Sequence, residues 1–448
     1  MSLEPGASLF SGLFARGAAA QATSDRAVLQ AMLSVELALI RALQTCGIAP
    51  AQAVVQTADV LNGIELDQFS LGRGSAEQGT PVPALLSQLR EQLPDPARSH
   101  LHAGATSQDI VDSALMLVAR DALGIVLADL DRAIAAGRRL AEHHRGAPIA
   151  GRTLLQQALP TSFGLKAAVW TSGLHDAANE LREVREHGLA AQLGGAVGTL
   201  AVYGDRGLDV AAAFASELGL GAPLIPWHTI RVRPARLAAA LGVALGMMGK
   251  VARDVVLLAQ TEVGEAAEGG DGDRGGSSTM PHKRNPVGAI AVLACAGQAP
   301  GLVATVLAAM TQEHERGAGS WQSEWQPLLT LLRLAGSGAD ALAELLENLR
   351  VDPQAMQRNL ADTGALLMTE SVVTALAPSL GRAQASERVG SAAARAREED
   401  RPLPDVLERD DVVRDAIGAD GLTRALDPRQ YLGVGDALIG RVLAQVAR

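Results

Sequence analysis

One proline-free run of apolar residues at helical spacing constrains the fold more than any other feature of this sequence. The run extends from Ser107 to about His144, and its apolar side chains recur every three or four residues. This spacing places them along one face of an α-helix. A helix of this length is about three times as long as the mean helix of a globular protein. The run therefore predicts an architecture built on long helices.

Four further runs predict long helices in the same part of the chain. They cover residues 160–187, 234–268, 286–310 and 326–349. Long helices without the composition of membrane spans usually pack side by side in a bundle. Aromatic residues make up only 2% of the chain, while alanine, leucine and glycine dominate, so the core must consist of aliphatic side chains between closely packed helices. We expect a mostly α-helical fold with a central long-helix bundle.

Regions richer in proline flank the bundle and predict smaller helical domains at both ends. A broken, proline-containing region covers about 49–99, and prolines shorten the segments again after Val351. The expected domains are an N-terminal helical domain (1–105), the central long-helix bundle (106–350) and a small C-terminal helical domain (351–448).

Local signals predict one helix end to end and very little strand. Ser24 and Asp25 can cap a helix near the N-terminus, and Gly47 is suited to end it. No strand pattern is convincing apart from short ribbons near 201–203 and 229–232.

The charge and composition of the chain limit which classes of molecule it is expected to bind. The formal net charge is −10, which argues against nucleic acid as the main partner but allows a local cation cluster to bind a small anion. No run of about 18 uninterrupted apolar residues and no signal peptide is evident, so we expect a soluble cytoplasmic protein without a membrane partner. The two cysteines, Cys46 and Cys295, lie in no metal-binding pattern.

Two polar segments interrupt the helical pattern and are candidate site elements. The first, HAGATSQD, covers His102–Asp109 and lies where the longest helix begins. Thr106 or Ser107 is a natural N-cap there, and the exposed amides of a helix start favour an anion. The second, GRTLLQQALP, covers Gly151–Pro160 and contains Thr153 and Gln156. On its own, the first segment is better explained as an ordinary helix cap preceded by a turn, and the second, as a polar turn, is uninformative.

Two glycine-containing segments need separate interpretation. GGAVGT, Gly194–Thr199, lacks the preceding strand and the full GxGxxG spacing of a dinucleotide site, so we expect a tight turn. GGDGDRGGSSTMPHKRNP, residues 269–286, is neither a P-loop nor a GxSxG elbow. Its glycines allow backbone freedom and its prolines restrict it, which suits a loop that closes on a ligand in one pose. A simple surface loop would not explain the end of this segment, MPHKRNP, where two prolines restrict the backbone.

The stretch GSSTMPHKRNP, Gly276–Pro286, resembles the signature of the fumarase/aspartase superfamily. HAGATSQD and GGAVGT resemble two further segments of that superfamily, in the same order and spacing, so the resemblance covers essentially the whole chain. It implies a three-domain, mostly α-helical subunit with a central long-helix bundle. It also implies a homotetramer in which several subunits build each active site.

Two branches of the superfamily fit the sequence. Segments near the N-terminus and EHERGAGSWQSEW, Glu313–Trp325, look like the 3-carboxy-cis,cis-muconate cycloisomerase branch of aromatic catabolism. The adenylosuccinate-lyase branch is the alternative, but such lyases typically place a histidine directly after the threonine of TLLQQALP. That position is Leu154 here. A third alternative is a structural homologue without enzymatic activity.

The resemblance assigns roles to individual residues. Ser277 matches the catalytic base. Lys283 and Asn285 match the pair that stabilises the anionic intermediate. His102 is a catalytic candidate, and the alternative is that it serves as a structural hydrogen-bonding residue. Arg316 is expected to contact substrate, the alternative being an ion pair with Glu313 or Glu315. The resemblance implies a small anionic tricarboxylate substrate and no cofactor or metal. The expected substrate-binding residues are Thr106, Ser107, Thr153, Gln156, Asn285 and Arg316.

Overall fold

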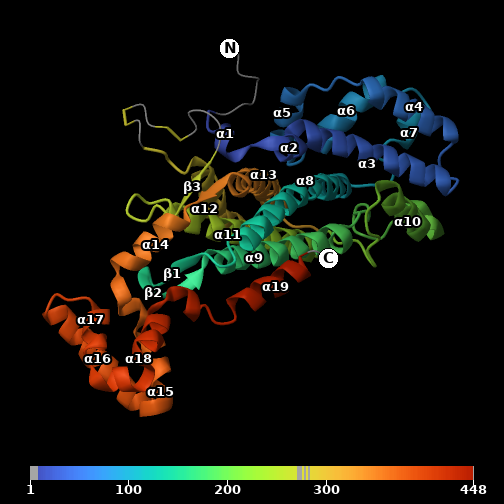
Figure 1. The fold of residues 1–448 in the computed structure, drawn as a ribbon. Coiled ribbons are helices and arrows are strands. Elements are labelled where there is room, and N and C mark those ends of the chain that lie inside the picture. Colours follow the sequence, from blue (N-terminus) through green and yellow to red (C-terminus); the bar gives the residue numbers. More distant parts are fainter. Residues whose placement is uncertain (1–8, 270–274, 277–278, 281–282, 447–448) are drawn as a thin grey trace. The chain divides into compact units, whose positions relative to one another are not determined.

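The structure of the protein, a computed structural model, describes residues 9–269, 275–276, 279–280 and 283–446. Helices make up most of these residues, and the strands form two small antiparallel sheets (Figure 1). The expected mostly α-helical fold is therefore confirmed. The chain divides into two compact units, and the three-domain division remains a prediction. The units are residues 1–130, 177–249 and 291–341, and residues 131–176, 250–290 and 342–448.

Five long helices contribute residues to both units. Their positions confirm the predicted long-helix architecture, and the longest begins at Ser107, as expected. The five are α8 (Ser107–His143), α9 (Phe163–Glu183), α11 (Val232–Leu258), α12 (Val287–Ala308) and α13 (Ser320–Glu347).

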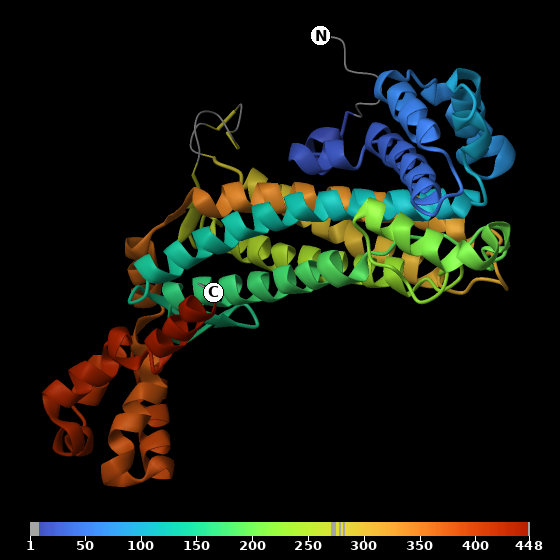
Figure 2. The same cartoon turned by 90° about the vertical axis from the view of Figure 1, so that its right-hand side faces the viewer.

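Within the first unit, small residues let these helices approach closely. A Cβ atom on Gly242 of α11 would lie 2.8 Å from a side-chain carbon of Val303 of α12, and one on Gly249 would lie 2.9 Å from Ala296. Real Cβ atoms do not come this close to other carbons, so glycine is required at both positions. Figure 2 shows α11, α12 and α13 running side by side here. The glycine and alanine content therefore has the packing role that the composition indicated.

The remaining helices of the first unit are shorter. Helix α3 begins at the expected cap, where the Ser24 hydroxyl oxygen accepts from the backbone N–H of Ala27 at 3.3 Å. It packs against α4 and α10. The elements are α1 (Ser11–Phe14), α2 (Gly17–Ala22), α3 (Asp25–Thr45), α4 (Ala51–Gly63), α5 (Gln68–Gln78), α6 (Val82–Gln92), α7 (Ala97–His100), a π-helical turn η1 (Val184–Gly188), the 3₁₀ segment η2 (Ala201–Arg206) and α10 (Gly207–Leu218).

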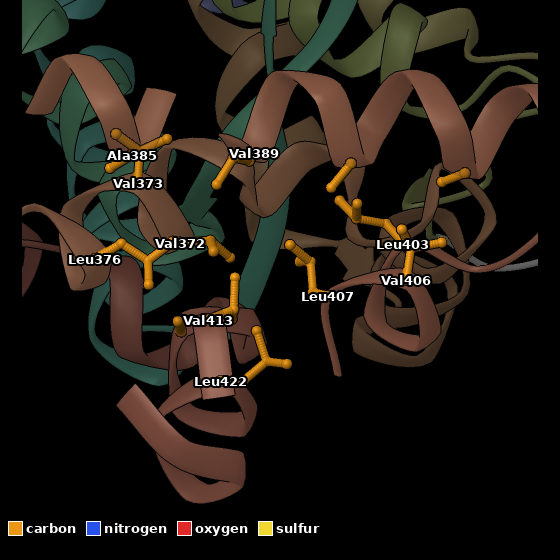
Figure 3. Packing of buried hydrophobic residues seen from close by; sticks show 13 residues of the cluster. Val372, Val373, Leu376, Ala385, Val389, Leu403, Val406, Leu407, Val413 and Leu422 are labelled. Carbon is orange, nitrogen blue, oxygen red and sulfur yellow. The ribbon is translucent and has the colours of Figure 1, made fainter. Parts of the chain in front are cut away.

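The second unit contains the four strands of the described residues and the C-terminal helices. Helices α15 to α18 pack around an apolar cluster that includes Val372, Val389, Leu407 and Val413 (Figure 3). The elements are β1 (Pro148–Thr153), β2 (Gln156–Ser162), β3 (Ala266–Glu268), β4 (Leu349–Val351), α14 (Pro353–Asp362), η3 (Gly364–Met368), α15 (Thr369–Leu380), α16 (Arg382–Glu398), α17 (Leu403–Glu408), α18 (Asp411–Leu426), η4 (Pro428–Tyr431) and α19 (Gly435–Gln445).

The predicted strands were wrong. Residues 201–203 begin the 3₁₀ segment η2, and residues 229–232 lead into α11. The observed strands β1 and β2 form a hairpin inside GRTLLQQALP, and β3 pairs with β4. Apolar runs this short carry no reliable period, so tertiary contacts decided their conformation.

One predicted helix is also shorter than expected. Helix α11 ends at Leu258 and does not reach residue 268, because the chain reverses through Gly264, which has a φ of +57°. The backbone N–H of Glu265 then donates to the carbonyl oxygen of Leu258 at 3.0 Å. This turn directs the following residues into β3.

Length and composition alone would allow two described helices, α3 and α12, to cross a membrane, and a third span arises if the bent pair 353–380 is counted as one. In α12 only 28% of the most apolar stretch is buried within this chain. Most of the apolar stretch of α12 is therefore not covered by the described part of this chain.

Candidate active site

The start of α8 is held by a carboxylate from its own first turn. The backbone N–H of Thr106 donates to Asp109 Oδ2 at 3.0 Å, and the N–H of Asp109 donates to the Thr106 carbonyl oxygen at 2.9 Å. This reciprocal pairing resembles a capping box and leaves the Thr106 hydroxyl unused as a cap. The expected helix start is confirmed.

The Asp109 carboxylate also joins this segment to the glycine-rich segment of the first unit. It is fully buried and accepts from the backbone N–H groups of Gly194 at 3.0 Å and Gly195 at 2.9 Å. His228 Nε2 lies 2.7 Å from Asp109 Oδ1 and must be the donor, because a carboxylate only accepts. Charge-assisted hydrogen bonds of this kind are the strong ones in proteins. Two candidate segments separated in sequence are thus fixed to each other.

Arg316 reaches the same place from a third part of the chain. Its Nη1 donates to Gln108 Oε1 at 3.0 Å, and its Nη2 donates to the Ala196 carbonyl oxygen at 2.7 Å. Glu313, the expected alternative partner, instead accepts from the backbone N–H of Ala318 at 2.9 Å. The guanidinium is therefore positioned by α8 and the glycine-rich segment together.

A buried charged network fixes this part of α8 to α13. Arg231 is 2% exposed and binds Asp112 through Nη1 at 2.8 Å and Glu324 through Nη2 at 2.7 Å. Burial raises the pKa of Glu324, and the hydrogen bond from Arg231 partly offsets this effect. The indole N–H of Trp321 donates to Asp112 at 3.0 Å, and its ring packs edge to face on Trp325. Trp321 therefore belongs to this network, and Trp325 packs against it.

The hydroxyl groups of Thr106 and Ser107 remain available to a ligand. Both side chains are half-buried at the start of α8. Within the described part of the chain, neither hydroxyl has a protein hydrogen-bond partner. A helix start with free hydroxyls beside a guanidinium can bind a carboxylate.

His102 lies in the same segment and has a buried acidic partner. Its Nδ1 is 2.7 Å from Glu36 Oε1, and its side chain is 14% exposed. Sequence reasoning missed Glu36, although a single acid on the apolar face of a helix was a usable signal. The first unit thus brings His102, Thr106, Ser107 and Arg316 into one connected region.

The second unit presents Thr153 and Gln156 at the end of the β1–β2 hairpin. They pair across the hairpin and flank Leu154 and Leu155 at its tip. Both leucines have positive φ, +52° and +64°, and they are 96% and 74% exposed. Leucine rarely adopts such a conformation and rarely stands fully in solvent. The tip is both strained and apolar, which is typical of a functional element.

Part of the signature segment is described, and it folds back on itself. Ser277 and His282 lie outside the described residues. Lys283 Nζ donates to Asn285 Oδ1 at 2.7 Å, and Asn285 Nδ2 donates to the Gly275 carbonyl oxygen at 3.1 Å. The ammonium and the amide expected to stabilise an anion are therefore adjacent.

A cavity of about 50 Å³ lies beside Asn285 in this unit, lined also by Glu268 and Arg284. Ligand pockets for drug-sized molecules are about 300–1,000 Å³, so this cavity is too small for a tricarboxylate. Among the described residues of this unit, a hydrogen bond joins Lys283 to Asn285 but none joins them to Thr153 or Gln156.

Comparison with known proteins identifies the family. The family model described as lyase matches residues 15–301, and the model for the adenylosuccinate lyase C-terminus matches residues 365–442. The 3-carboxy-cis,cis-muconate cycloisomerase of Pseudomonas aeruginosa is 43% identical over 448 residues, covering 99% of this chain and 98% of the relative. The nitrosuccinate lyase of Streptomyces davaonensis is 41% identical, covering 94% of this chain and 91% of the relative.

A solved structure agrees with these sequence matches. The crystal structure of 3-carboxy-cis,cis-muconate lactonizing enzyme from Pseudomonas putida superposes with a TM-score of 0.92 at 38% identity, covering 98% of this chain and 99% of that one. The expected superfamily fold is confirmed. The chain therefore belongs to this lyase family, the fumarase/aspartase superfamily whose signature its sequence carries, and is similar over its whole length to 3-carboxy-cis,cis-muconate cycloisomerases.

Proposed function

We propose that the protein is a cycloisomerase that converts 3-carboxy-cis,cis-muconate to 4-carboxymuconolactone in protocatechuate catabolism. The observation that carries this proposal is the 43% identity, over nearly the full length of both chains, to a relative named for that activity. The free hydroxyl groups and cationic side chains of the candidate site support it, since they suit a substrate with three carboxylates.

The reaction is an internal addition across a double bond. One substrate carboxylate oxygen bonds to the adjacent alkene carbon, and the π electron pair moves to the α-carbon and onto its carboxylate. The resulting aci-carboxylate carries two negative charges, and Lys283 and Asn285 are the groups we assign to its stabilisation. Ser277 then delivers a proton to the α-carbon. The trianionic substrate therefore becomes a dianionic lactone, and every substrate atom is retained. The proton that Ser277 gives up is replaced from solvent, and it balances the carboxylic proton that the substrate lost when it ionised.

Leu154 supports a cyclisation over an ordinary lyase reaction. In the reverse direction the leaving group is the substrate's own carboxylate. A carboxyl group in water ionises with a pKa of about 4, so this group departs without a proton. An amine or alkoxide leaves badly and needs a general acid such as histidine. An apolar residue at the hairpin tip is consistent with a site that has no such need.

We further propose a homotetramer whose active sites combine residues of several subunits. The exposed apolar surface of α12 would be covered by other copies, which removes it from water. The small cavity beside Asn285 supports the same conclusion, because walls from another subunit would be required to enclose the substrate. We propose a cytoplasmic location and expect no membrane or nucleic-acid partner.

The test follows loss of the conjugated diene of 3-carboxymuconate by ultraviolet absorbance. We expect turnover by the purified protein, and we expect Ser277→Ala to lower kcat by about two orders of magnitude or more while the circular dichroism spectrum is unchanged. Near-normal turnover by that variant would remove the serine from the mechanism. Complete inertness of the wild type toward every family substrate would favour the non-enzymatic alternative.

A second candidate is release of nitrite from nitrosuccinate, favoured by the 41% identity to the nitrosuccinate lyase. Nitrite is a weak base and leaves without protonation, so Leu154 fits this reaction as well. Adenylosuccinate, the substrate of the alternative branch, requires a site for a phosphate and a purine. Assaying the three substrates in parallel separates the candidates, and the substrate with the highest kcat/KM identifies the activity.

A further inference from the structure

Glu36 is a buried carboxylate whose only hydrogen bond in the described structure is to His102. It lies on α3, its side chain is 0% exposed, and its Oε1 is 2.7 Å from His102 Nδ1. The other oxygen, Oε2, is buried and has no partner among the described residues. A bare buried acceptor costs about 1–3 kcal/mol, so an apolar residue would be the more stable choice here. The carboxylate is therefore poorly explained by folding alone.

The backbone around His102 is strained and fixed from a second side. His102 has a φ of +60°, and the Ala103 carbonyl oxygen accepts a hydrogen bond from the Tyr203 hydroxyl at 2.8 Å. Gly104 has a φ of +81°, and a Cβ atom there would lie 2.6 Å from the Tyr203 ring. Non-glycine residues in the left-handed region persist where their surroundings hold them, and they cluster at functional sites. The turn thus delivers the imidazole to Glu36 in one orientation.

The two ring nitrogens of His102 have different environments. Nδ1 faces Glu36, and a carboxylate only accepts, so Nδ1 carries a proton whether the ring is neutral or charged. Nε2 has no protein partner within the described residues. Any proton that His102 gains or loses is therefore exchanged at Nε2.

We propose that Glu36 is a positioning residue, which fixes the tautomer and orientation of His102 so that only Nε2 is available for proton exchange in the active site. This inference rests on the proposed function and on the resemblance that makes His102 a catalytic candidate. Among the described residues, Tyr203 of η2 interacts electrostatically with Glu36 and also with Asp109 of α8. Burial raises the pKa of Tyr203, with Asp109 and Glu36 adding to the effect, so its hydroxyl stays neutral throughout the working pH range.

The test combines a spectroscopic and a kinetic measurement on the full chain. Protein labelled with ¹⁵N-histidine is studied by long-range ¹H–¹⁵N correlation at a pH where the ring is neutral, with His102→Gln used to assign the signal. The wild type is expected to show Nδ1 protonated and Nε2 unprotonated. In Glu36→Gln the side-chain amide can donate to Nδ1, so the proton is expected to move to Nε2.

The kinetic arm measures kcat and KM for 3-carboxymuconate. Glu36→Gln is expected to lower kcat about tenfold or more and to leave KM within about threefold, because the wrong nitrogen then carries the proton. Glu36→Asp keeps an acceptor and is expected to recover part of kcat. Thr57→Val is the matched control: Thr57 is a fully buried polar side chain of the same unit, and its hydroxyl donates to the Ala53 carbonyl oxygen.

The outcomes separate this inference from the proposed function. A wild-type His102 protonated at Nε2 overturns the inference without any variant, and so does an unchanged kcat in Glu36→Gln despite a changed tautomer. If the wild type does not turn over 3-carboxymuconate, the proposed function fails while the tautomer measurement still decides the pairing. A kcat loss in Thr57→Val equal to that in Glu36→Gln assigns the effect to core disruption and overturns the positioning role.

Discussion

Arg152 and Glu265 form a two-point ion pair close to the tip of the β1–β2 hairpin. Arg152 Nη1 lies 2.7 Å from Glu265 Oε2, and Nη2 lies 2.8 Å from Oε1. The Glu265 carboxylate is 0% exposed and also accepts from Asn359 Nδ2 at 2.8 Å. The strained hairpin tip is therefore tied to the turn that ends α11 and to α14.

Removing this carboxylate charge should destabilise the second unit. Glu265→Gln leaves the Arg152 guanidinium, 21% exposed, without its counter-ion. Breaking a buried pair costs about 3–5 kcal/mol, and the partial exposure of Arg152 lowers the expected loss to about 2–3 kcal/mol. Urea denaturation followed by circular dichroism measures this loss of unfolding free energy.

The matched control is Glu347→Gln. Glu347 pairs with Arg132 at 2.8 Å, but these side chains are 31% and 45% exposed. An exposed pair contributes about 0–1 kcal/mol, so this variant should be nearly as stable as the wild type. Equal losses of unfolding free energy in the two variants would show that burial of Glu265 does not increase its contribution to stability.

The long helices could be predicted because their signal is local. An apolar residue every three or four positions reports which face is buried, whatever the partner helix is. The run beginning at Ser107 and the helix capped by Ser24 were predicted correctly for this reason.

The β1–β2 hairpin could not be predicted in the same way. Its two-residue turn is Leu154–Leu155, whereas such turns usually carry asparagine and glycine, and the burial along its strands does not alternate regularly. The contact that anchors it, Arg152 to Glu265, joins residues 113 positions apart. No local pattern contains that information.

The candidate site was predictable in its residue types but not in its connections. The signature supplied Lys283 and Asn285, and the structure shows them hydrogen-bonded. Pairing of Glu36 with His102 and of Asp109 with Gly194 depends on contacts across 66 and 85 positions. Such pairs form only when the helices have packed.

The hairpin tip provides a test of its place in a site. Replacing Leu154–Leu155 by Asn-Gly supplies the residues that favour positive φ, and each strained leucine costs about 1 kcal/mol or more. We expect the unfolding temperature to stay at or above that of the wild type while kcat/KM for 3-carboxymuconate falls about tenfold or more. Thermal unfolding and steady-state kinetics check the two parts. Unchanged kinetics would place the tip outside the active site.

Asp410 should make the C-terminal helices sensitive to acid. It caps α18 by accepting from the backbone N–H of Val412 at 3.0 Å, and it binds Arg388 at 2.7 Å. Burial opposes its ionisation, but the hydrogen bonds from Arg388 and from the backbone of Val413 and Val412 outweigh this, so its pKa is lowered. The stability it contributes is thus present above its unfolded pKa of about 3.8 and is lost as pH falls through its lower folded pKa.

Asp410→Asn should therefore cost about 1–2 kcal/mol of unfolding free energy at pH 7. Its difference from the wild type should narrow as pH drops below about 4, because the unfolded state then binds a proton that the folded carboxylate takes up only at lower pH. Urea denaturation at both pH values gives the comparison. Asp411→Asn is the control. Because Asp411 is 79% exposed, this substitution should change the free energy of unfolding by less than about 0.5 kcal/mol. A difference that is independent of pH would contradict the assignment.

Arg316 either contacts the substrate or only fixes the glycine-rich segment to α8, and a substitution distinguishes these two roles. Lysine at this position keeps the charge but cannot reach both Gln108 Oε1 and the Ala196 carbonyl oxygen, which the two guanidinium nitrogens bind at 3.0 and 2.7 Å. We expect Arg316→Lys to lower kcat/KM by about tenfold to a hundredfold. Arg206→Ala is the control, because exposed Arg206 likewise donates to a backbone carbonyl of the first unit, that of Cys46 at 2.7 Å. A stability loss with unchanged kcat/KM in Arg316→Lys would mean that the guanidinium only fixes the glycine-rich segment, whereas a kinetic loss at wild-type stability would mean that it acts on the substrate.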